Sequence, residues 1–193
     1  MKPFGRASFV PAPALLCLDL QREQTVTSGL EPDDASRCIE QCRRVLRHAR
    51  ASGWQVAHAH RHDGTLLGMS EHSRPIEGLE PLPREPVFYR DRPSAFSSAP
   101  FRDFVSRLGD PRLIVVGFSL HASVLFTAVA SYELGVPLTV VQGALAAPAS
   151  RKVSGELMEA VLLNVLGSFA EVVSADQLLQ ATGPLLAHAA NHP

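Results

Sequence analysis

The chain has very little lysine. Lys2 and Lys152 are the two lysines among its 193 residues, so arginine supplies almost all of the 18 basic side chains. An arginine keeps its proton throughout the physiological pH range, because its pKa lies above about 12. A site with arginine in place of lysine can therefore stabilise negative charge, but the arginine cannot shuttle a proton.

Paired cysteines, net charge and long apolar segments are also scarce. Three cysteines, Cys17, Cys38 and Cys42, make no paired disulfide framework. The formal net charge of −1 does not favour binding to nucleic acid or to an anionic membrane. No apolar run reaches the roughly 18 residues that span a bilayer, and the N-terminal segment lacks a clear signal-peptide pattern. We therefore expect a cytoplasmic protein with no nucleic-acid partner and no membrane partner.

Short apolar runs alternate with segments of helical periodicity along the chain. The apolar runs predict strands at residues 14–20, 54–60, 87–90, 113–116, 137–142 and 170–173. The helical spacing predicts helices at 32–52, 100–108, 123–134, 154–166 and 175–181. This alternation indicates a single α/β domain over residues 1–193, in three layers α/β/α with a mostly parallel central sheet. The phosphate-binding patterns GxGxxG and GxxxxGK[ST] do not occur, which argues against nucleotide binding.

The segment 113–132, LIVVGFSLHASVLFTAVASY, passes from an apolar strand through a short turn into a helix. Such a turn presents free backbone N–H groups and the positive end of a helix dipole, so Ser123 is placed to act as a nucleophile. Serine is also a preferred residue at the start of a helix, and Ser123 can equally be only an N-cap. Both interpretations remain open at this point.

Two further groups of polar residues lie near predicted strand ends. Asp19 closes an otherwise apolar strand, where an unpaired carboxylate is costly to bury and where ligands bind in open α/β sheets. His58, His60 and His62 alternate, so they share one face of an extended strand. They can serve a metal or line a cleft, and we favour the cleft because no other ligand type lies nearby.

Three segments, taken together, resemble the isochorismatase-like hydrolases, a family that includes nicotinamidases, N-carbamoylsarcosine amidases and isochorismatases. ALLCLDLQ at 14–21 resembles the first strand of that family, with Asp19 followed by a hydrophobic residue and Gln21. EPVFYRDRPSAF at 85–96 resembles the stretch in which a catalytic lysine stands four residues before Ser-Ala-Phe. GFSLHASVLFTAVASYELGVPLTVV at 117–141 resembles the turn that carries the nucleophilic cysteine. The resemblance covers about residues 12–182.

The resemblance implies a catalytic set of Asp19, Arg90 and Ser123, in positions where the amidases have Asp, Lys and Cys. The implied reaction is hydrolysis of a C–N (amide) bond or an ester or ether bond of a small molecule. We expect Arg90 to pair with Asp19 and to lower its pKa. Isochorismatases also lack the cysteine, and His121 matches that subgroup.

The resemblance also implies the surroundings of the site. Backbone N–H groups of Ser119 and Ser123 form an oxyanion hole, and a cis peptide bond joins Phe118 to Ser119. Gln21, His60 and His121 belong to the pocket. No metal and no cofactor are expected, and a homo-oligomer, dimer or tetramer, is usual in the family. The alternative is an inactive member that binds a small molecule or a protein partner through the same cleft.

Overall fold

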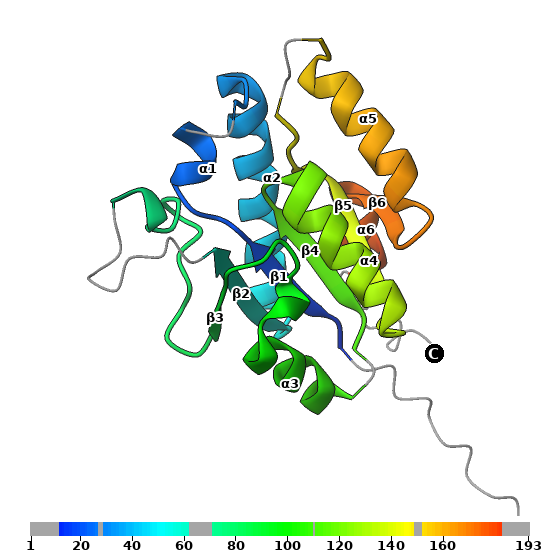
Figure 1. Ribbon diagram of the computed structural model, residues 1–193. Coiled ribbons are helices and arrows are strands. Elements are labelled where there is room, and N and C mark those ends of the chain that lie inside the picture. Colours follow the sequence, from blue (N-terminus) through cyan, green and yellow to red (C-terminus); the bar gives the residue numbers. More distant parts are fainter. Residues whose placement is uncertain (1–11, 27–28, 62–70, 110, 149–151, 183–193) are drawn as a thin grey trace, which may run out of the picture.

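A six-stranded parallel sheet organises the described part of the computed structural model, residues 12–26, 29–61, 71–109, 111–148 and 152–182 (Figure 1). The order of the strands across the sheet is β3-β2-β1-β4-β5-β6, and every adjacent pair is parallel. The strands are β1 (Ala14–Leu18), β2 (Gln55–Arg61), β3 (Val87–Arg90), β4 (Leu113–Gly117), β5 (Leu138–Leu145) and β6 (Glu171–Ser174). The predicted fold class, three-layer α/β with a parallel sheet, is confirmed.

Helices cover both faces of this sheet (Figure 1). One apolar core joins the sheet to α2 (Pro32–Ala51) and α6 (Ala175–Ala181). A second core, on the other face, joins it to α3 (Ala99–Leu108), α4 (Leu125–Glu133) and α5 (Gly155–Leu166). The short helix α1 (Glu23–Val26) follows β1, and single turns form at η1 (Glu71–Ser73), η2 (Ala95–Ser97) and η3 (Leu120–Val124). The central strands β1 and β4 are buried along their whole length, as expected for a sheet covered on both faces.

Element boundaries differ from the prediction by more than one residue at three places near the strand ends. β1 stops at Leu18 because Asp19 adopts a left-handed backbone conformation, with φ of 51°. Helical structure after β4 begins at Leu120 rather than at Ser123. β5 continues to Leu145 through an irregularity in its pairing with β4, beyond the expected end at Gln142.

Gly117 brings the ends of β1 and β4 unusually close together. A Cβ atom at this position would lie 1.9 Å from the carbonyl oxygen of Leu18, far inside van der Waals contact. Its φ of 135° also lies in a region that favours glycine. The Phe118 N–H then donates to that same Leu18 oxygen at 3.0 Å. This close approach sets the turn after β4 directly beside Asp19.

Candidate active site

Asp19, Arg90 and Ser123 meet at the carboxyl ends of three strands. Ser123 Oγ donates a hydrogen bond of 2.6 Å to Asp19 Oδ2. Arg90 Nη2 donates both to Asp19 Oδ2, forming an ion pair, and to Ser123 Oγ at 2.9 Å. The three residues are 1 %, 3 % and 5 % exposed, respectively. The structure therefore brings together the three side chains that the sequence singled out as a catalytic set.

The backbone around this triad is held in an uncommon conformation. Asp19 and Ser119 are the two non-glycine residues with positive φ in the described part of the chain, at 51° and 60°. Left-handed conformations cost free energy in residues other than glycine and concentrate at functional sites. Ser119 Oγ donates a 3.0 Å hydrogen bond to Gln24 Oε1, which ties the turn to α1. One left-handed residue thus belongs to the triad, and the other lies in the turn that carries Ser123.

Ser123 is not the N-cap of the helix. It lies inside η3, a single π-helical turn that precedes α4, and Ser119 stands at the cap position. The Ser123 hydroxyl donates to Asp19 and accepts from Arg90. Isolated π turns are frequent at functional sites. The N-cap interpretation of Ser123 is therefore wrong.

The peptide bond between Phe118 and Ser119 is trans, and no described residue has a cis bond. The expectation of a cis bond at this place is wrong. The chain turns here through the left-handed conformation of Ser119. The Phe118 N–H is engaged with Leu18 O, and the Leu120 N–H donates to Ala146 O at 3.0 Å. These two amides are committed to the fold, so the oxyanion hole is left to other donors.

Burial dominates the electrostatics of the triad. It raises the pKa of Asp19 above the usual range, although the Arg90 guanidinium and the Ser123 hydroxyl offset part of the effect. The expected pair of Arg90 with Asp19 is present and it does lower this pKa, but removal from water has the larger, opposite effect. Burial likewise lowers the pKa of Arg90, while Asp19 opposes the change. A carboxylate with a raised pKa is a better proton acceptor than an exposed one.

The two glutamines after β1 hold loops in place. Gln21 Nε2 donates to Ser73 O at 3.0 Å, and Gln21 Oε1 accepts from the Arg61 N–H at 3.0 Å. Its side chain thereby joins the end of β2 to η1, and its contact with a ligand stays a prediction. Sequence analysis missed Gln24. The only sequence feature that could have indicated Gln24 is its position five residues after Asp19. The helix that carries it has four residues, too few to show a helical periodicity.

The predicted pocket histidines differ in burial. His60 is buried, and burial together with the nearby charges lowers its pKa to about 4, so it is neutral at pH 7. His121 is exposed on η3, whereas the Ser123 hydroxyl is directed to Asp19. His62 lies outside the described residues. A pocket role for His60 and for His121 stays a prediction.

His58 belongs to a separate buried network. Its Nε2 lies 2.9 Å from Glu85 Oε2, and Arg50 holds the same carboxylate with Nε and Nη2 at 2.8 and 2.9 Å. Burial lowers the pKa of His58, so its ring is neutral and donates to Glu85. Arg50, the Leu82 N–H and His58 together hold the pKa of Glu85 down at about 2. This network fastens α2 to the segment before β3, a role of Glu85 that sequence analysis missed.

Among the residues that the structure describes, no three side chains of His, Cys, Asp or Glu gather into a group able to hold a metal ion. The expectation that the site uses no metal stays a prediction. No helix in the same part of the chain is long and apolar enough to cross a membrane.

The sequence and the fold both match known proteins. The model of the isochorismatase domain family matches residues 13–177. An isochorismatase from Pseudomonas putida KT2440 is 27 % identical, with a TM-score of 0.75 over 86 % of this chain and 92 % of the other. An isochorismatase-family hydrolase structure from Chromobacterium violaceum has a TM-score of 0.79 at 21 % identity, over 90 % and 94 % of the two chains.

N-carbamoylsarcosine amidase from Thermoplasma acidophilum shares the fold, with a TM-score of 0.67 at 20 % identity over 86 % of this chain and 97 % of its own. A comparison with curated protein sequences finds no match. The domain match covers most of the chain, and the parallel sheet and the arrangement of helices agree with these structures. The chain belongs to the isochorismatase domain family of hydrolases.

Proposed function

We propose that this protein hydrolyses an amide or ester bond of a small molecule, with Ser123 as nucleophile and Asp19 as general base. One observation carries the proposal: the Ser123 hydroxyl donates to Asp19 Oδ2 at 2.6 Å inside a buried site. A nucleophile within hydrogen-bonding distance of its base is the arrangement that activates a hydroxyl group. The raised pKa of Asp19 suits it to this task.

In the first step, Asp19 Oδ2 takes the hydroxyl proton while Ser123 Oγ bonds to the substrate carbonyl carbon. The tetrahedral intermediate then breaks its bond to nitrogen or oxygen, and protonated Asp19 returns the proton to the leaving group. An acyl ester remains on Ser123. Water attacks this ester, gives its proton to Asp19 and releases the acid, while Ser123 recovers its own proton from Asp19.

Arg90 stays protonated throughout these steps. Its Nη2 group donates to Ser123 Oγ at 2.9 Å and therefore stabilises the alkoxide character that develops on this oxygen. Its Nη1 group donates to Arg92 O at 2.6 Å, which fixes the direction of the guanidinium. The family's lysine position thus carries charge here without transferring a proton. For the substrate oxyanion we assign the backbone N–H groups of Ser119 and Ser123 as donors.

A binding protein without catalytic activity is the second candidate. The observation that favours it is the buried ion pair between Arg90 and Asp19, in which both side chains stabilise each other. If Asp19 does not leave this pair to accept a proton, the triad serves only as structure. A small molecule or a protein partner would then occupy the cleft without being turned over.

Turnover of a panel of small amides, carbamoyl compounds, esters and isochorismate tests the proposal. Product release by the wild type that is lost in Asp19→Ala supports hydrolysis at this site. Ser123→Ala separates two mechanisms: it abolishes a covalent route and spares one in which Asp19 activates water directly. A folded wild type that binds a member of the panel without turnover favours the binding candidate.

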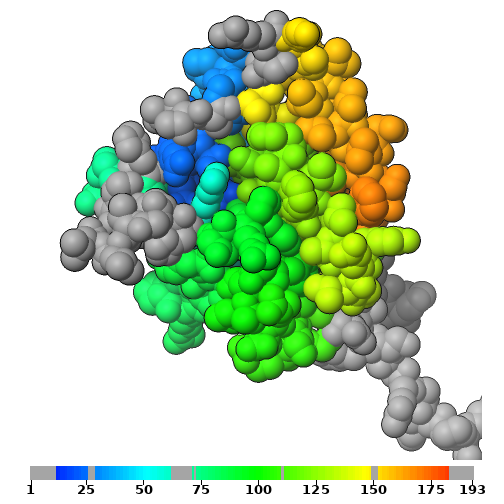
Figure 2. Space-filling view, in the orientation of Figure 1, coloured from blue at the N-terminus to red at the C-terminus, as the bar shows by residue number. Residues whose placement is uncertain are grey.

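We also propose that the protein is a homo-oligomer, joined through the outer face of α4 and α5. This face is turned toward the viewer in Figure 2. The exposed large apolar side chains of these two helices are Phe126 and Tyr132 from α4 and Leu157, Val161 and Val165 from α5. The α5 residues repeat every four positions, so they form one stripe along the helix. An apolar face of this kind marks an interaction surface.

A further inference from the structure

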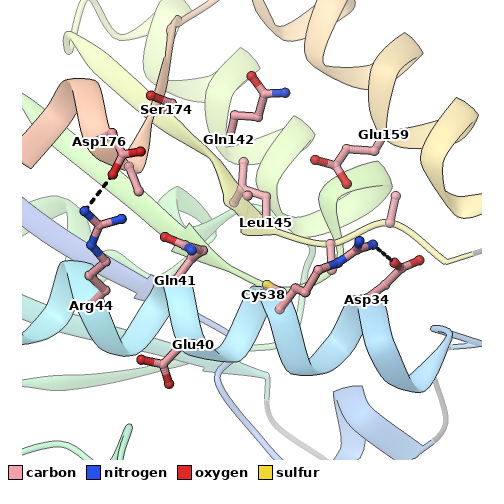
Figure 3. A pocket seen from close by; sticks show the side chains of 15 residues that line it. Asp34, Cys38, Glu40, Gln41, Arg44, Gln142, Leu145, Glu159, Ser174 and Asp176 are labelled. Carbon is pink, nitrogen blue, oxygen red and sulfur yellow. Dashed lines mark hydrogen bonds and ion pairs between the residues drawn. The ribbon is translucent and has the colours of Figure 1, made fainter.

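A cavity of about 540 Å³ lies at the carboxyl ends of β5 and β6, between α2 and α5 (Figure 3). This volume is typical of small-molecule sites, and the carboxyl edge of a parallel sheet is where such sites form. Asp19, Arg90 and Ser123 are not among its lining residues. The Leu120 N–H donates to Ala146 O in its floor, so the cavity neighbours the candidate active site without sharing its side chains.

An irregular strand creates the floor of the cavity. On β4, Val115 pairs with Val140 and Gly117 pairs with Leu145, so two steps along β4 correspond to five along β5. The extra residues include Gly143, whose φ of 84° turns the backbone outward beside α2. Strand bulges often lie next to functional sites. The resulting floor is apolar and consists of Leu145, Ala146 and Ala147, with Cys38 from α2.

Acidic side chains outnumber basic side chains around this floor. Four carboxylates and two guanidinium groups line the cavity: Asp34, Glu40, Glu159 and Asp176, with Arg37 and Arg44. Both arginines are already committed, Arg37 to Asp34 and Arg44 to Asp176 at 2.6 Å. Figure 3 shows these two pairs at opposite ends of the cavity. The arginines are therefore neutralised, and the excess charge is negative.

Glu40 pairs with Arg43 and Arg47, which lie outside the lining set, so Glu159 is the lining carboxylate that these ion pairs leave over. It is half-buried, and within the described residues it has no hydrogen bond or ion pair. Burial and the nearby charge of Asp34 raise the pKa of Glu159, and the charge of Arg37 offsets only part of this rise, so the ionised form is incompletely compensated. Its side chain extends from α5 toward the same space as Gln41 from α2 and Gln142 from β5 (Figure 3). These amides add hydrogen-bonding groups beside an unpaired anion.

We propose that this cavity binds a small aliphatic amine in its ammonium form, with the cation on Glu159 and the aliphatic body over the apolar floor. An ammonium group matches a partly desolvated carboxylate, and an alkyl chain matches Leu145, Ala146 and Ala147. A carboxylate ligand meets excess negative charge and is rejected. A neutral alcohol of equal size gains the floor contacts but no ion pair.

Nuclear magnetic resonance titration of the ¹⁵N-labelled wild type with n-butylammonium, n-butanol and butyrate tests this assignment. The expected result is saturable shifts for butylammonium, centred on residues 144–147 and 159, and affinity at least tenfold weaker for the alcohol and the acid. Shifts centred elsewhere, comparable affinity for all three compounds, or no saturable shift with butylammonium overturns it. The three ligands have the same length, so the comparison isolates charge.

Two variants and one control locate the cation. Glu159→Gln weakens butylammonium binding at least tenfold, whereas Glu133→Gln, an exposed carboxylate at the end of α4, leaves it unchanged. Gln142→Lys places a competing ammonium in the cavity from an exposed position and also abolishes binding. Unchanged affinity in Glu159→Gln overturns the proposal, and the Gln142→Lys variant decides the matter if Glu159→Gln does not fold.

Discussion

Ser123 Oγ lies 2.6 Å from Asp19 Oδ2, although 104 residues separate the two positions in the chain. The contact depends on the close approach of β1 and β4 and on two left-handed residues, Asp19 and Ser119. Arg90 reaches the same pair from β3. Arg90 is the last residue of β3, and Asp19 and Ser123 lie in the turns that follow β1 and β4. All three side chains are buried from bulk water.

Gly117→Ala will disrupt this arrangement because its Cβ would overlap the Leu18 carbonyl group. We expect the free energy of unfolding to fall by more than about 4 kcal/mol, a loss that single substitutions cause only when they severely disrupt the local structure. Gly53→Ala is the matched control, since Gly53 also has positive φ but nothing lies within 4 Å of the added carbon. That control should cost only about 1–2 kcal/mol. Urea unfolding of both variants measures the difference, and equal losses would show that the close approach is unimportant.

The raised pKa of Asp19 predicts how activity depends on pH. Asp19 must be ionised to accept the Ser123 proton, so kcat/KM falls as the pH drops through this pKa, above the ordinary range for aspartate. Arg90→Gln removes a cation that favours the ionised form, so the inflection moves to higher pH. Arg90→Lys keeps the charge and holds the inflection near the wild-type position. A ¹³C titration of the Asp19 carboxyl group measures the same pKa without turnover. An inflection that moves to lower pH in Arg90→Gln would contradict the stabilisation of the ionised carboxylate by Arg90.

Glu85→Gln will destabilise the protein at neutral pH, because it breaks the bidentate pair with Arg50 and weakens the contact with His58. We expect a loss of about 1.5–3 kcal/mol, typical of hydrogen bonds to a charged group. The pKa of Glu85 is about 2 in the folded protein, below its ordinary 4.5, so its contribution is complete above pH 4.5. The contribution is lost as the pH falls toward 2, and the wild type and the variant then converge. Glu80→Gln, in an exposed position of the same loop, serves as the control in the unfolding measurements.

Leu157→Asp will weaken self-association if the face of α4 and α5 joins two copies. Burying an unpaired carboxylate in an apolar interface is costly, so we expect at least a tenfold rise in the dissociation constant. Leu82→Asp is the matched control, because Leu82 is similarly exposed but lies outside this face. Sedimentation equilibrium gives both constants. Equal behaviour of the two variants, or a monomeric wild type, would reject this interface.

The sequence predicted the layers of the fold well because its strands are short, apolar and separated by clear helical segments. The meeting of Asp19, Arg90 and Ser123 was also predictable, since each lies in a segment that resembles the family pattern, whereas their catalytic role stays a prediction. Features that depend on spatial packing were not predictable. The direction of the Asp19 pKa shift reflects burial, and the conformation of Ser119 and the role of Gln24 arise from contacts between distant segments. The irregular pairing of β5 was also missed, because Gln142 and Gly143 suggest the end of a strand rather than a break in its register.

An acyl group on Ser123 during turnover would be direct evidence that this serine is the nucleophile. The protein is incubated with an ester or amide that it turns over, quenched in acid during turnover, digested and analysed by mass spectrometry. We expect the mass of the acyl group on the peptide that contains Ser123, and no such adduct in Asp19→Ala, which cannot activate the hydroxyl. Turnover by the wild type without an adduct, together with full activity in Ser123→Ala, would contradict Ser123 as the nucleophile.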